Sequence, residues 1–247
     1  MKNRILLLMF LILCSANLWS QSKTNVTIPL IGDNAPTFIA ETTSGQLDFP
    51  ADYGNNWKII FSHPRDFTPV CSSEILELAH MQAQFEKLGV KLLIVSTDTL
   101  DQHKLWVRAL EDISYKNKTP VKINFPLADD KNMSISKKYG MLHEPTSSSK
   151  DVRGVFIIDP KNKIQAVFFY PMNVGRNMEE IKRTVIALQT VSSTGHGKDQ
   201  LVTPANWQLG EDLMVPHYPY TQSELKDNPS LKDSYYSLST FMWYKKM

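Results

Sequence analysis

The stretch from Ser62 to Cys71, SHPRDFTPVC, constrains the fold of this chain more than any other. It follows the apolar run 57–61, which is typical of a strand. Thr68 then has the residue type of a helix N-cap, and Pro69 suits the first helical position, where no N–H is needed. We therefore expect a strand, a short loop and a helix with Cys71 in its first turn. Free backbone N–H groups and the positive end of the helix dipole favour an anion there, which for a cysteine is the thiolate.

The first twenty residues have the layout of a secretory signal peptide. Lys2 and Arg4 precede the apolar run 5–13, and small and polar residues follow. The run is too short to span a bilayer, and a buried helix or strand is the alternative. Residues 11–14, LILC, faintly resemble a bacterial lipoprotein box, but a leucine stands where a small residue is expected. We predict that residues 1–20 are a cleaved signal peptide and that the protein is exported, periplasmic or secreted, without stable membrane insertion.

Removal of the signal peptide changes both the charge and the cysteine count. Of 27 basic residues, Lys2 and Arg4 lie in it, which leaves 25 against 25 acidic residues. A near-neutral chain gives no electrostatic reason to bind nucleic acid or an anionic membrane surface. Of two cysteines, Cys14 is also removed. Cys71 then has no partner for an internal disulfide and is either buried or reactive.

Strand and helix patterns alternate through residues 26–190, which we assign to one domain. Apolar runs of strand length lie at 37–40, 58–61, 91–96, 125–129, 154–158 and 164–169. Helical patterns follow Cys71 as far as Gly89 and cover 98–113, 132–139 and 178–190. The last two strands flank the turn 159–163 and are expected to form a hairpin, and 143–151 reads as a surface loop. This order predicts an α/β fold with a mixed sheet covered by helices.

The remaining residues, 191–247, differ in composition. From residue 196 the chain has four prolines, several aromatic residues and little periodicity. We interpret this part as a small C-terminal extension domain. It needs the main domain or a partner to bury its large aromatic residues, which are Trp207, Tyr218, Tyr220 and Trp243.

A cysteine at a helix start is, by itself, more often structural than catalytic. Its neighbours favour catalysis here. Pro64 and Pro69 stiffen the loop, and the Thr68 hydroxyl can turn toward the sulfur or toward an oxygen bound beside it. His63 and Arg65 add polarity that a merely packed cysteine does not require. For His63, a structural hydrogen bond at the strand end is at least as good an explanation as proton transfer.

The spacing Pro64-x-x-x-Thr68-x-x-Cys71 resembles the active-site signature of the peroxiredoxin family, and SHPRDFTPVC closely resembles its one-cysteine subgroup. Three later stretches resemble that subgroup in the same order: RGVF at 153–156, YP and GRN within 170–177, and the TP, W, G and MV positions within 203–215. The resemblance covers the chain from about residue 26 to its end. It implies a thioredoxin-like fold followed by the C-terminal domain of one-cysteine peroxiredoxins.

The resemblance also implies a role for each residue of the signature. Cys71 would be the peroxidatic nucleophile that attacks a peroxide oxygen and becomes a sulfenic acid. Thr68 would hydrogen-bond the substrate, and Pro64 would shield the sulfur from water. A free cysteine with a pKa of about 8.5 is only about 3% thiolate at pH 7, so full ionisation gains about thirtyfold at most. Most of the rate must therefore come from donors placed for charge on the peroxide oxygens.

Arg153 is the donor that the resemblance supplies from a distant part of the sequence. It would hold the thiolate and stabilise charge as the O–O bond breaks, and Glu74 and Arg176 would orient it. Spacing alone cannot bring Arg153 to Cys71. For either arginine in isolation a surface ion pair is the better explanation.

By resemblance, the chain is a thiol-dependent peroxidase for hydrogen peroxide and organic hydroperoxides, with a role in antioxidant defence. Since no second thiol remains, an external thiol must reduce the sulfenic acid. The reductant would be a small thiol or a thioredoxin- or glutaredoxin-like protein, and a homodimer is expected. Some members of the subgroup have a phospholipase activity that uses a serine before the first strand. Residues 52–57 contain none, so that activity is not expected.

No cofactor or metal is predicted. The spacing of five histidines fits no zinc pattern, and we expect them on the solvated surface: His80, His103, His143, His196 and His217. Two alternatives to the peroxidase stay open. A thiol–disulfide oxidoreductase of the same fold is disfavoured because CSSE at 71–74 lacks the second cysteine of C-x-x-C. A non-catalytic holdase or interaction module would keep the scaffold without turnover.

Overall fold

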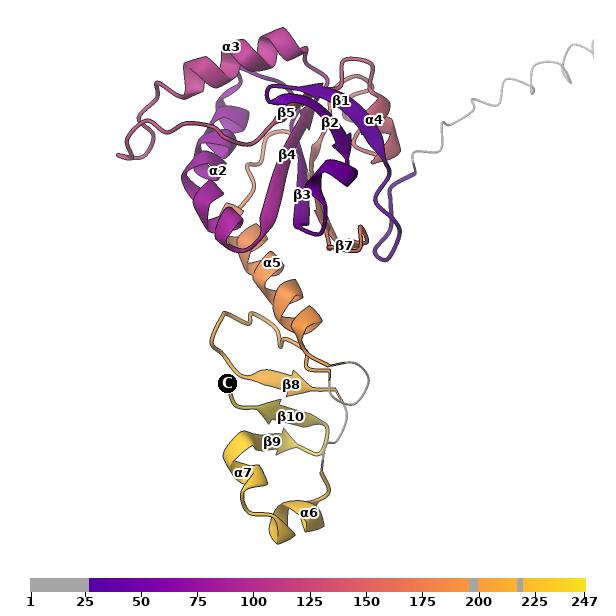
Figure 1. Cartoon of the computed structure of the whole chain (residues 1–247), viewed down its shortest axis with the longest axis vertical. Helices are drawn as coiled ribbons and strands as arrows, with labels where there is room; N and C mark the ends of the chain where they lie inside the picture. The colour runs from indigo at the N-terminus through magenta and orange to yellow at the C-terminus, as the bar shows by residue number, and fades with distance from the viewer. Residues whose placement is uncertain (1–26, 196–199, 217–219) are drawn as a thin grey trace, which may run out of the picture.

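The computed structural model describes residues 27–195, 200–216 and 220–247, so the predicted signal peptide lies outside the described residues. A larger unit is built on a seven-stranded mixed sheet with the strand order β2-β1-β5-β4-β3-β6-β7 (Figure 1). Its strands are β1 (Phe38–Thr42), β2 (Gly45–Phe49), β3 (Trp57–Ser62), β4 (Val90–Ser96), β5 (Leu127–Asp129), β6 (Arg153–Ile158) and β7 (Ile164–Tyr170). Its helices are the short η2 (Ala51–Tyr53), α2 (Pro69–Lys87), α3 (Leu100–Leu110), α4 (Ser134–Lys138) and α5 (Met178–Ser193).

Strand β3 lies in the middle of this sheet and carries the chain into the predicted cysteine loop. It runs parallel to β4 and antiparallel to β6, and all six of its residues are buried. A strand covered on both faces reads as the continuous apolar run seen in the sequence. The predicted hairpin of β6 and β7 is confirmed. The end of β3 therefore meets the start of β6 in the centre of the sheet.

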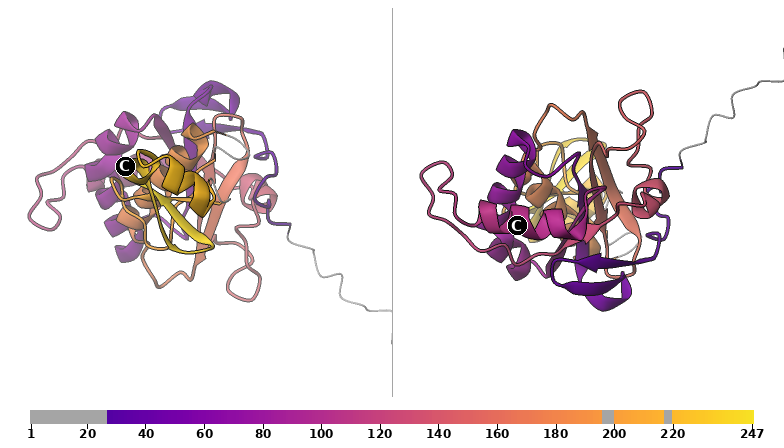
Figure 2. Two further views of the ribbon diagram at one scale, coloured as in Figure 1. Left: turned by 90° about the horizontal axis from the view of Figure 1, so that it is seen from below. Right: turned by 90° about the horizontal axis from the view of Figure 1, so that it is seen from above.

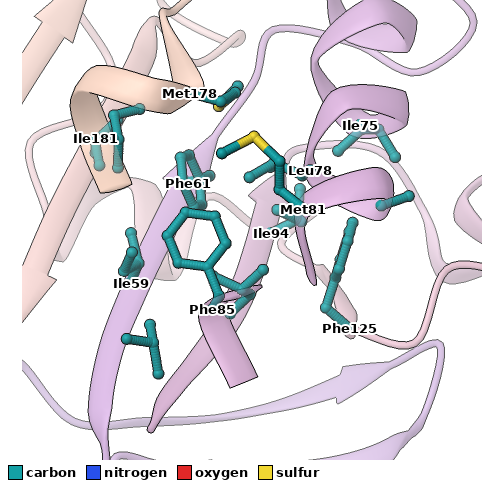
Figure 3. Close-up of a cluster of buried hydrophobic side chains, with 14 of the residues drawn as sticks. Ile59, Phe61, Ile75, Leu78, Met81, Phe85, Ile94, Phe125, Met178 and Ile181 are labelled. Atoms are coloured by element: carbon teal, nitrogen blue, oxygen red, sulfur yellow. The ribbon is translucent and has the colours of Figure 1, made fainter. Parts of the chain in front are cut away.

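Helices and strands cover both faces of the sheet and bury two apolar clusters. On one face, Ile59 and Phe61 of β3 pack among side chains of α2 and α5, including Phe85 and Ile181 (Figure 3). On the other face, Ile60 joins a cluster with residues of β2, α4 and β6. Each fully buried side chain of this size stabilises the fold by about 1.5–3 kcal/mol. Two filled faces hold the end of β3 rigidly.

Helix α2 begins and ends close to the predicted positions. Pro69 is its first residue, and the chain leaves the helix at Gly89, whose φ of 66° is the left-handed conformation that glycine adopts without strain. The sequence pattern predicts one apolar face with Leu78, Met81, Phe85 and Leu88. The first three are buried and Leu88 is partly buried.

Helix α3 is shorter than the predicted 98–113, and only part of its predicted apolar face is buried. It starts at a capping box in which Thr99 and Gln102 satisfy each other's backbone N–H groups. Leu105, Trp106, Leu110 and Ile113 recur with helical spacing, which predicts that they share an apolar face. Trp106 and Leu110 are buried, but Leu105 is 60% and Ile113 is 40% exposed. The buried residues of α3 are His103, Trp106 and Leu110. The following connection to β5 projects from one side of the larger unit (Figure 2).

Two predictions from the sequence are wrong. Strand β2 was not predicted. Asp151 was predicted in a surface loop, but it is buried. Strand β2 pairs antiparallel with β1 across the turn at residues 43–44. Its sequence, GQLDF, has too few apolar residues to read as a strand alone. In the parts of the chain that the structure describes, no helix combines the length and hydropathy needed to cross a membrane.

The C-terminal residues contain more regular structure than their sequence pattern indicated. A three-stranded antiparallel sheet forms from β8 (Leu213–Val215), β10 (Met242–Lys245) and β9 (Tyr235–Ser239), with short helices α6 (Gln222–Asp227) and α7 (Leu231–Ser234). This smaller unit extends away from the large sheet along α5 (Figure 1). As predicted, Trp207 and Trp243 are buried, and they pack with Ala187 of α5. Tyr220 is partly buried, and Tyr218 lies outside the described residues.

Candidate active site

Cys71 lies in the first turn of α2, directly beyond the centre of the sheet, and is completely buried. Thr68 occupies the N-cap position in an extended conformation, but its side chain does not cap the helix. Its hydroxyl donates instead to the carbonyl oxygen of Arg65 at 2.9 Å. That bond closes the loop on itself. Pro64 is buried in the same loop, whereas Arg65 and Phe67 are exposed.

Arg153 reaches Cys71 from the first position of β6. Its Nη1 donates to the sulfur at 3.3 Å and to Glu74 Oε2 at 2.8 Å. Its Nε and Nη2 both donate to the carbonyl oxygen of Met172, at 3.0 and 2.5 Å. The side chain is only 2% exposed. Because β3 and β6 are neighbours in the sheet, a guanidinium 82 residues away in the sequence lies against the sulfur.

Glu74, one turn along α2 from Cys71, binds both arginines. Arg176 donates to it three times, from its backbone N at 2.8 Å, from Nε at 2.9 Å and from Nη2 at 2.6 Å. Burial alone would raise the pKa of Glu74. The charge and hydrogen bonds of Arg176, together with the charge of Arg153, outweigh burial and lower the pKa of Glu74. The carboxylate is therefore ionised at neutral pH and fixes the arginine that contacts the sulfur.

Arg176 also ties together the two strand ends that form the floor of the site. Its Nη1 donates to the carbonyl oxygens of Ser62 and Gly154, both at 2.8 Å. The Ser62 hydroxyl donates to the carbonyl of Val152 at 2.7 Å and accepts from the N–H of Gly154 at 2.8 Å. The end of β3 and the start of β6 are thus joined by side chains as well as by the sheet.

A buried polar cluster holds the loop between β3 and α2. Asp66 lies between two imidazoles, with His63 Nε2 at 2.8 Å and His103 Nδ1 at 2.7 Å, and its backbone N–H donates to Asp98 at 2.8 Å. Burial lowers the pKa of His63 despite the hydrogen bond to Asp66. The ring is then neutral near pH 7, which supports a structural hydrogen bond for His63. A cavity of about 210 Å³ opens beside Asp66, Thr68 and Gln102.

Comparison with known proteins places this geometry in a family. Residues 31–167 match the AhpC/TSA family, and residues 187–227 match the C-terminal domain of 1-Cys peroxiredoxin. A peroxiredoxin of Methanosarcina mazei is 46% identical over 190 residues, which cover 76% of this chain and 84% of the relative. The chain belongs to the peroxiredoxin family.

Solved peroxiredoxins share the fold as well as the sequence. A yeast mitochondrial 1-Cys peroxiredoxin has a TM-score of 0.74 at 31% identity and covers 89% of this chain and 100% of its own. A mutant of peroxiredoxin 6 from Arenicola marina has a TM-score of 0.75 at 31% identity, with 88% and 97% covered. The fold is thioredoxin-like, as predicted, and this peroxiredoxin is a thiol-dependent peroxidase.

In this peroxiredoxin, the structure brings Arg153, Glu74 and Arg176 together beside Cys71, with Pro64 and Thr68 in the loop that precedes it. Arg153 contacts Cys71, and Glu74 contacts both arginines. The sequence analysis missed further residues that shape the site: Asp66, Asp98, His103, Trp106 and Met172. The Trp106 indole donates to Ser72 Oγ at 3.3 Å, and its ring lies 5.1 Å from that of His63. Trp106 and Leu110 follow His103 by three and seven residues, so all three lie on one face of α3. This helical spacing is visible in the sequence and could have predicted that His103 is buried.

The prediction of solvated histidines is wrong for His103, which is fully buried, and His80 and His143 are only partly exposed. His196 and His217 lie outside the described residues. Among the residues that are described, one group brings metal-binding side chains together: His63, Asp66 and Asp98. Each already has hydrogen-bond partners, and the Lys150 ammonium lies 3.2 Å from Asp98 Oδ1. The absence of a metal stays a prediction.

Proposed function

We propose that Cys71 is the peroxidatic residue of this enzyme and that its substrates are hydrogen peroxide and organic hydroperoxides. The observation that carries the proposal is the 3.3 Å contact between Arg153 Nη1 and Cys71 Sγ at a helix start. The thiolate attacks one peroxide oxygen, the O–O bond breaks, and the departing oxygen takes a proton and leaves as water or an alcohol. Arg153 stabilises negative charge on the oxygens as that bond breaks, and the Thr68 hydroxyl does so after it turns from the Arg65 carbonyl to the peroxide.

The remaining site residues support this chemistry by position. Pro64 shields the sulfur from water, and Glu74 with Arg176 keeps the guanidinium of Arg153 aimed at it. A Cys71→Ser variant tests the assignment. It should lose all peroxide turnover while keeping the fold, as judged by circular dichroism. If instead the purified, reduced wild-type protein consumes no hydrogen peroxide, the holdase alternative takes its place.

The sulfenic acid is reduced by an external thiol. With Cys14 in the predicted signal peptide, no second cysteine remains to form an internal disulfide. One thiol condenses with the sulfenic acid to a mixed disulfide and water, and a second thiol releases Cys71. The similar yeast 1-Cys peroxiredoxin was solved in a study of thiol resolution by glutathione and thioredoxin systems. Steady-state peroxide consumption with glutathione, thioredoxin or glutaredoxin as the sole reductant will identify the partner.

The assembly that we propose is a homodimer. Strand β7 lies at an edge of the large sheet, and six of its seven residues are partly exposed, including Phe168, Phe169 and Tyr170. An exposed, aromatic edge strand favours pairing with a second copy. Light scattering of the mature protein should give twice the chain mass, and the Phe168→Pro variant should give the mass of a monomer. A monomeric wild-type protein would contradict the assignment.

Export and the division of the chain are also proposals. Residues 1–20 would be removed on export, and 26–190 and 191–247 would be the peroxidase domain and its C-terminal extension. Intact mass of the protein recovered from the periplasm or the medium gives the cleavage site. A full-length chain retained in the cytoplasm would contradict export.

A further inference from the structure

Asp151 is a buried acid that the peroxidase chemistry does not use. It is 0% exposed, and among the described residues no group donates a hydrogen bond to either of its carboxyl oxygens. It immediately precedes Val152, which is bonded to the end of β3, and it stands two residues before Arg153. A buried carboxylate that accepts no hydrogen bond is strongly destabilised relative to the neutral acid.

The hydrogen-bond donors near Asp151 are taken up by a second acid, Asp130. Asp130 accepts four hydrogen bonds, from Ser134 Oγ and Ile135 N on one oxygen and from the N and Oγ of Ser136 on the other. Each oxygen of Asp130 thus has two donors. Because the Ser136 hydroxyl gives its proton to Asp130 at 2.5 Å, it has only lone pairs left for Asp151.

Burial and the neighbouring acids favour the neutral form of Asp151. Burial raises its pKa to about 8, and the negative charges of Asp130 and Asp98 add to the rise. Ser136 and the positive charge of Lys150 oppose that rise in the pKa of Asp151 without overcoming it. The Lys150 ammonium is itself bound to Asp98 Oδ1 at 3.2 Å and to Thr97 Oγ1 at 3.3 Å. Asp151 is therefore a neutral acid at pH 7.

We propose that Asp151, in its protonated form, is a positioning residue for Arg153. Its acid proton is donated to Ser136 Oγ, which donates in turn to Asp130, and this chain fixes the start of β6. Loss of that proton removes the bond and leaves a second buried anion beside Asp130. The carboxylate then moves toward water, and the backbone two residues before Arg153 moves with it.

The backbone around Asp151 transmits this change to the active site. Val152 donates its N–H to Met141 at 2.9 Å and accepts the Ser62 hydroxyl at 2.7 Å, and Gly154 donates to the same hydroxyl. These bonds keep Arg153 within reach of Cys71 only while the backbone of residues 151–154 stays in place. Peroxide reduction should therefore fall at alkaline pH, where a cysteine thiolate alone would remain reactive.

The test is the rate constant for oxidation of reduced protein by hydrogen peroxide in a single turnover, from pH 6 to pH 10. Wild type should lose about tenfold per pH unit above about pH 8, as expected for one ionisation. Asp151→Asn, which stays neutral and can donate to Ser136, should keep its rate, and so should Asp151→Thr. The control Asp233→Asn removes an exposed acid of α7 and should follow wild type.

Infrared difference spectra of the resting protein give a second readout that does not depend on activity. A protonated carboxylic acid band should be present at pH 7, be lost by pH 10, and be missing in the Asp151 variants. Two outcomes overturn the proposal. One is an alkaline loss of rate that persists in both Asp151 variants, and the other is a wild-type protein with neither the band nor the loss.

Discussion

Replacement of Glu74 by glutamine removes the anion that Arg153 and Arg176 share while it preserves shape. The carboxylate now accepts four hydrogen bonds, two on each oxygen. The glutamine amide has only one accepting oxygen. Its NH₂ group must take the place of the other carboxylate oxygen, where it faces two N–H donors and accepts from neither. Both guanidinium groups stay buried, at 2% and 7% exposure, without a counter-charge.

The expected cost is large because removal of one partner of a buried ion pair leaves uncompensated charge. Such changes cost about 3–5 kcal/mol of folding free energy. The pH dependence has a definite sign. Since the pKa of Glu74 is lowered in the folded protein, its contribution is present above the ordinary value of 4.5 and is lost as pH falls through the folded pKa. The stability difference between wild type and Glu74→Gln should therefore shrink in acid.

Glu74→Gln should also lower the rate of peroxide reduction, because it lets the guanidinium of Arg153 move. Arg153 Nη1 donates to both Glu74 and Cys71, so loss of the first contact frees the guanidinium to shift. A displacement of about 1 Å from the reacting atoms costs about 100-fold in rate. Glu77→Gln is the matched control, because Glu77 lies three residues along α2 and pairs with the exposed Lys116 and Lys118. Surface pairs of that kind contribute little.

The assays are urea unfolding at pH 7 and single-turnover oxidation by hydrogen peroxide below the unfolding transition. We expect Glu74→Gln to be less stable and slower than wild type, and Glu77→Gln to match wild type in both stability and rate. If the Glu74 and Glu77 variants have the same stability and the same rate, the buried carboxylate does not organise the site and the reasoning is wrong.

Three further changes test other parts of the site. Arg153→Ala should slow peroxide reduction by about 10²–10³-fold, as removal of a donor to a developing oxyanion does; rates that match wild type at saturating pH would refute this. Thr68→Ser should retain most of the rate and Thr68→Val should lose it, with circular dichroism as the check that both fold; equal rates would remove Thr68 from the chemistry. Gly154→Ala should lower stability by about 1–3 kcal/mol, because the new Cβ would lie 2.9 Å from Ser62 Oγ. Gly175→Ala, whose Cβ would meet Val70 at an ordinary 3.4 Å, is its control in urea unfolding.

The part of the site nearest Cys71 could be predicted because its signals are local. A strand, two prolines and a threonine determine where the helix starts, and helix geometry then places the cysteine in the first turn. Glu74 lies one turn later on the same helix, but its role came only from the resemblance to peroxiredoxins. Arg153 is different, since its position depends on the pairing of β3 with β6, which no local pattern encodes. Only the resemblance to peroxiredoxins supplied it.

The errors arose where tertiary contacts override local pattern. Leu105 looked like part of the inner face of α3, but the sheet accepts the His103 and Trp106 face, and a buried Asp66 satisfies the imidazole. Asp151 sits beside serines and lysine, which reads as a surface loop. Its burial depends on α4 and β6 closing over it. Strand β2 owes its extended form to its pairing with β1.

Peptide mass spectrometry of Cys71, after the reduced mature protein meets one equivalent of hydrogen peroxide, tests whether this cysteine is the group that peroxide oxidises. With a sulfenic-acid trap present, we expect the peptide containing Cys71 to carry the trap in proportion to the peroxide consumed. Arg153→Ala should carry far less at the same time point. Peroxide that disappears while Cys71 stays a free thiol, or equal trapping in both proteins, would contradict the account.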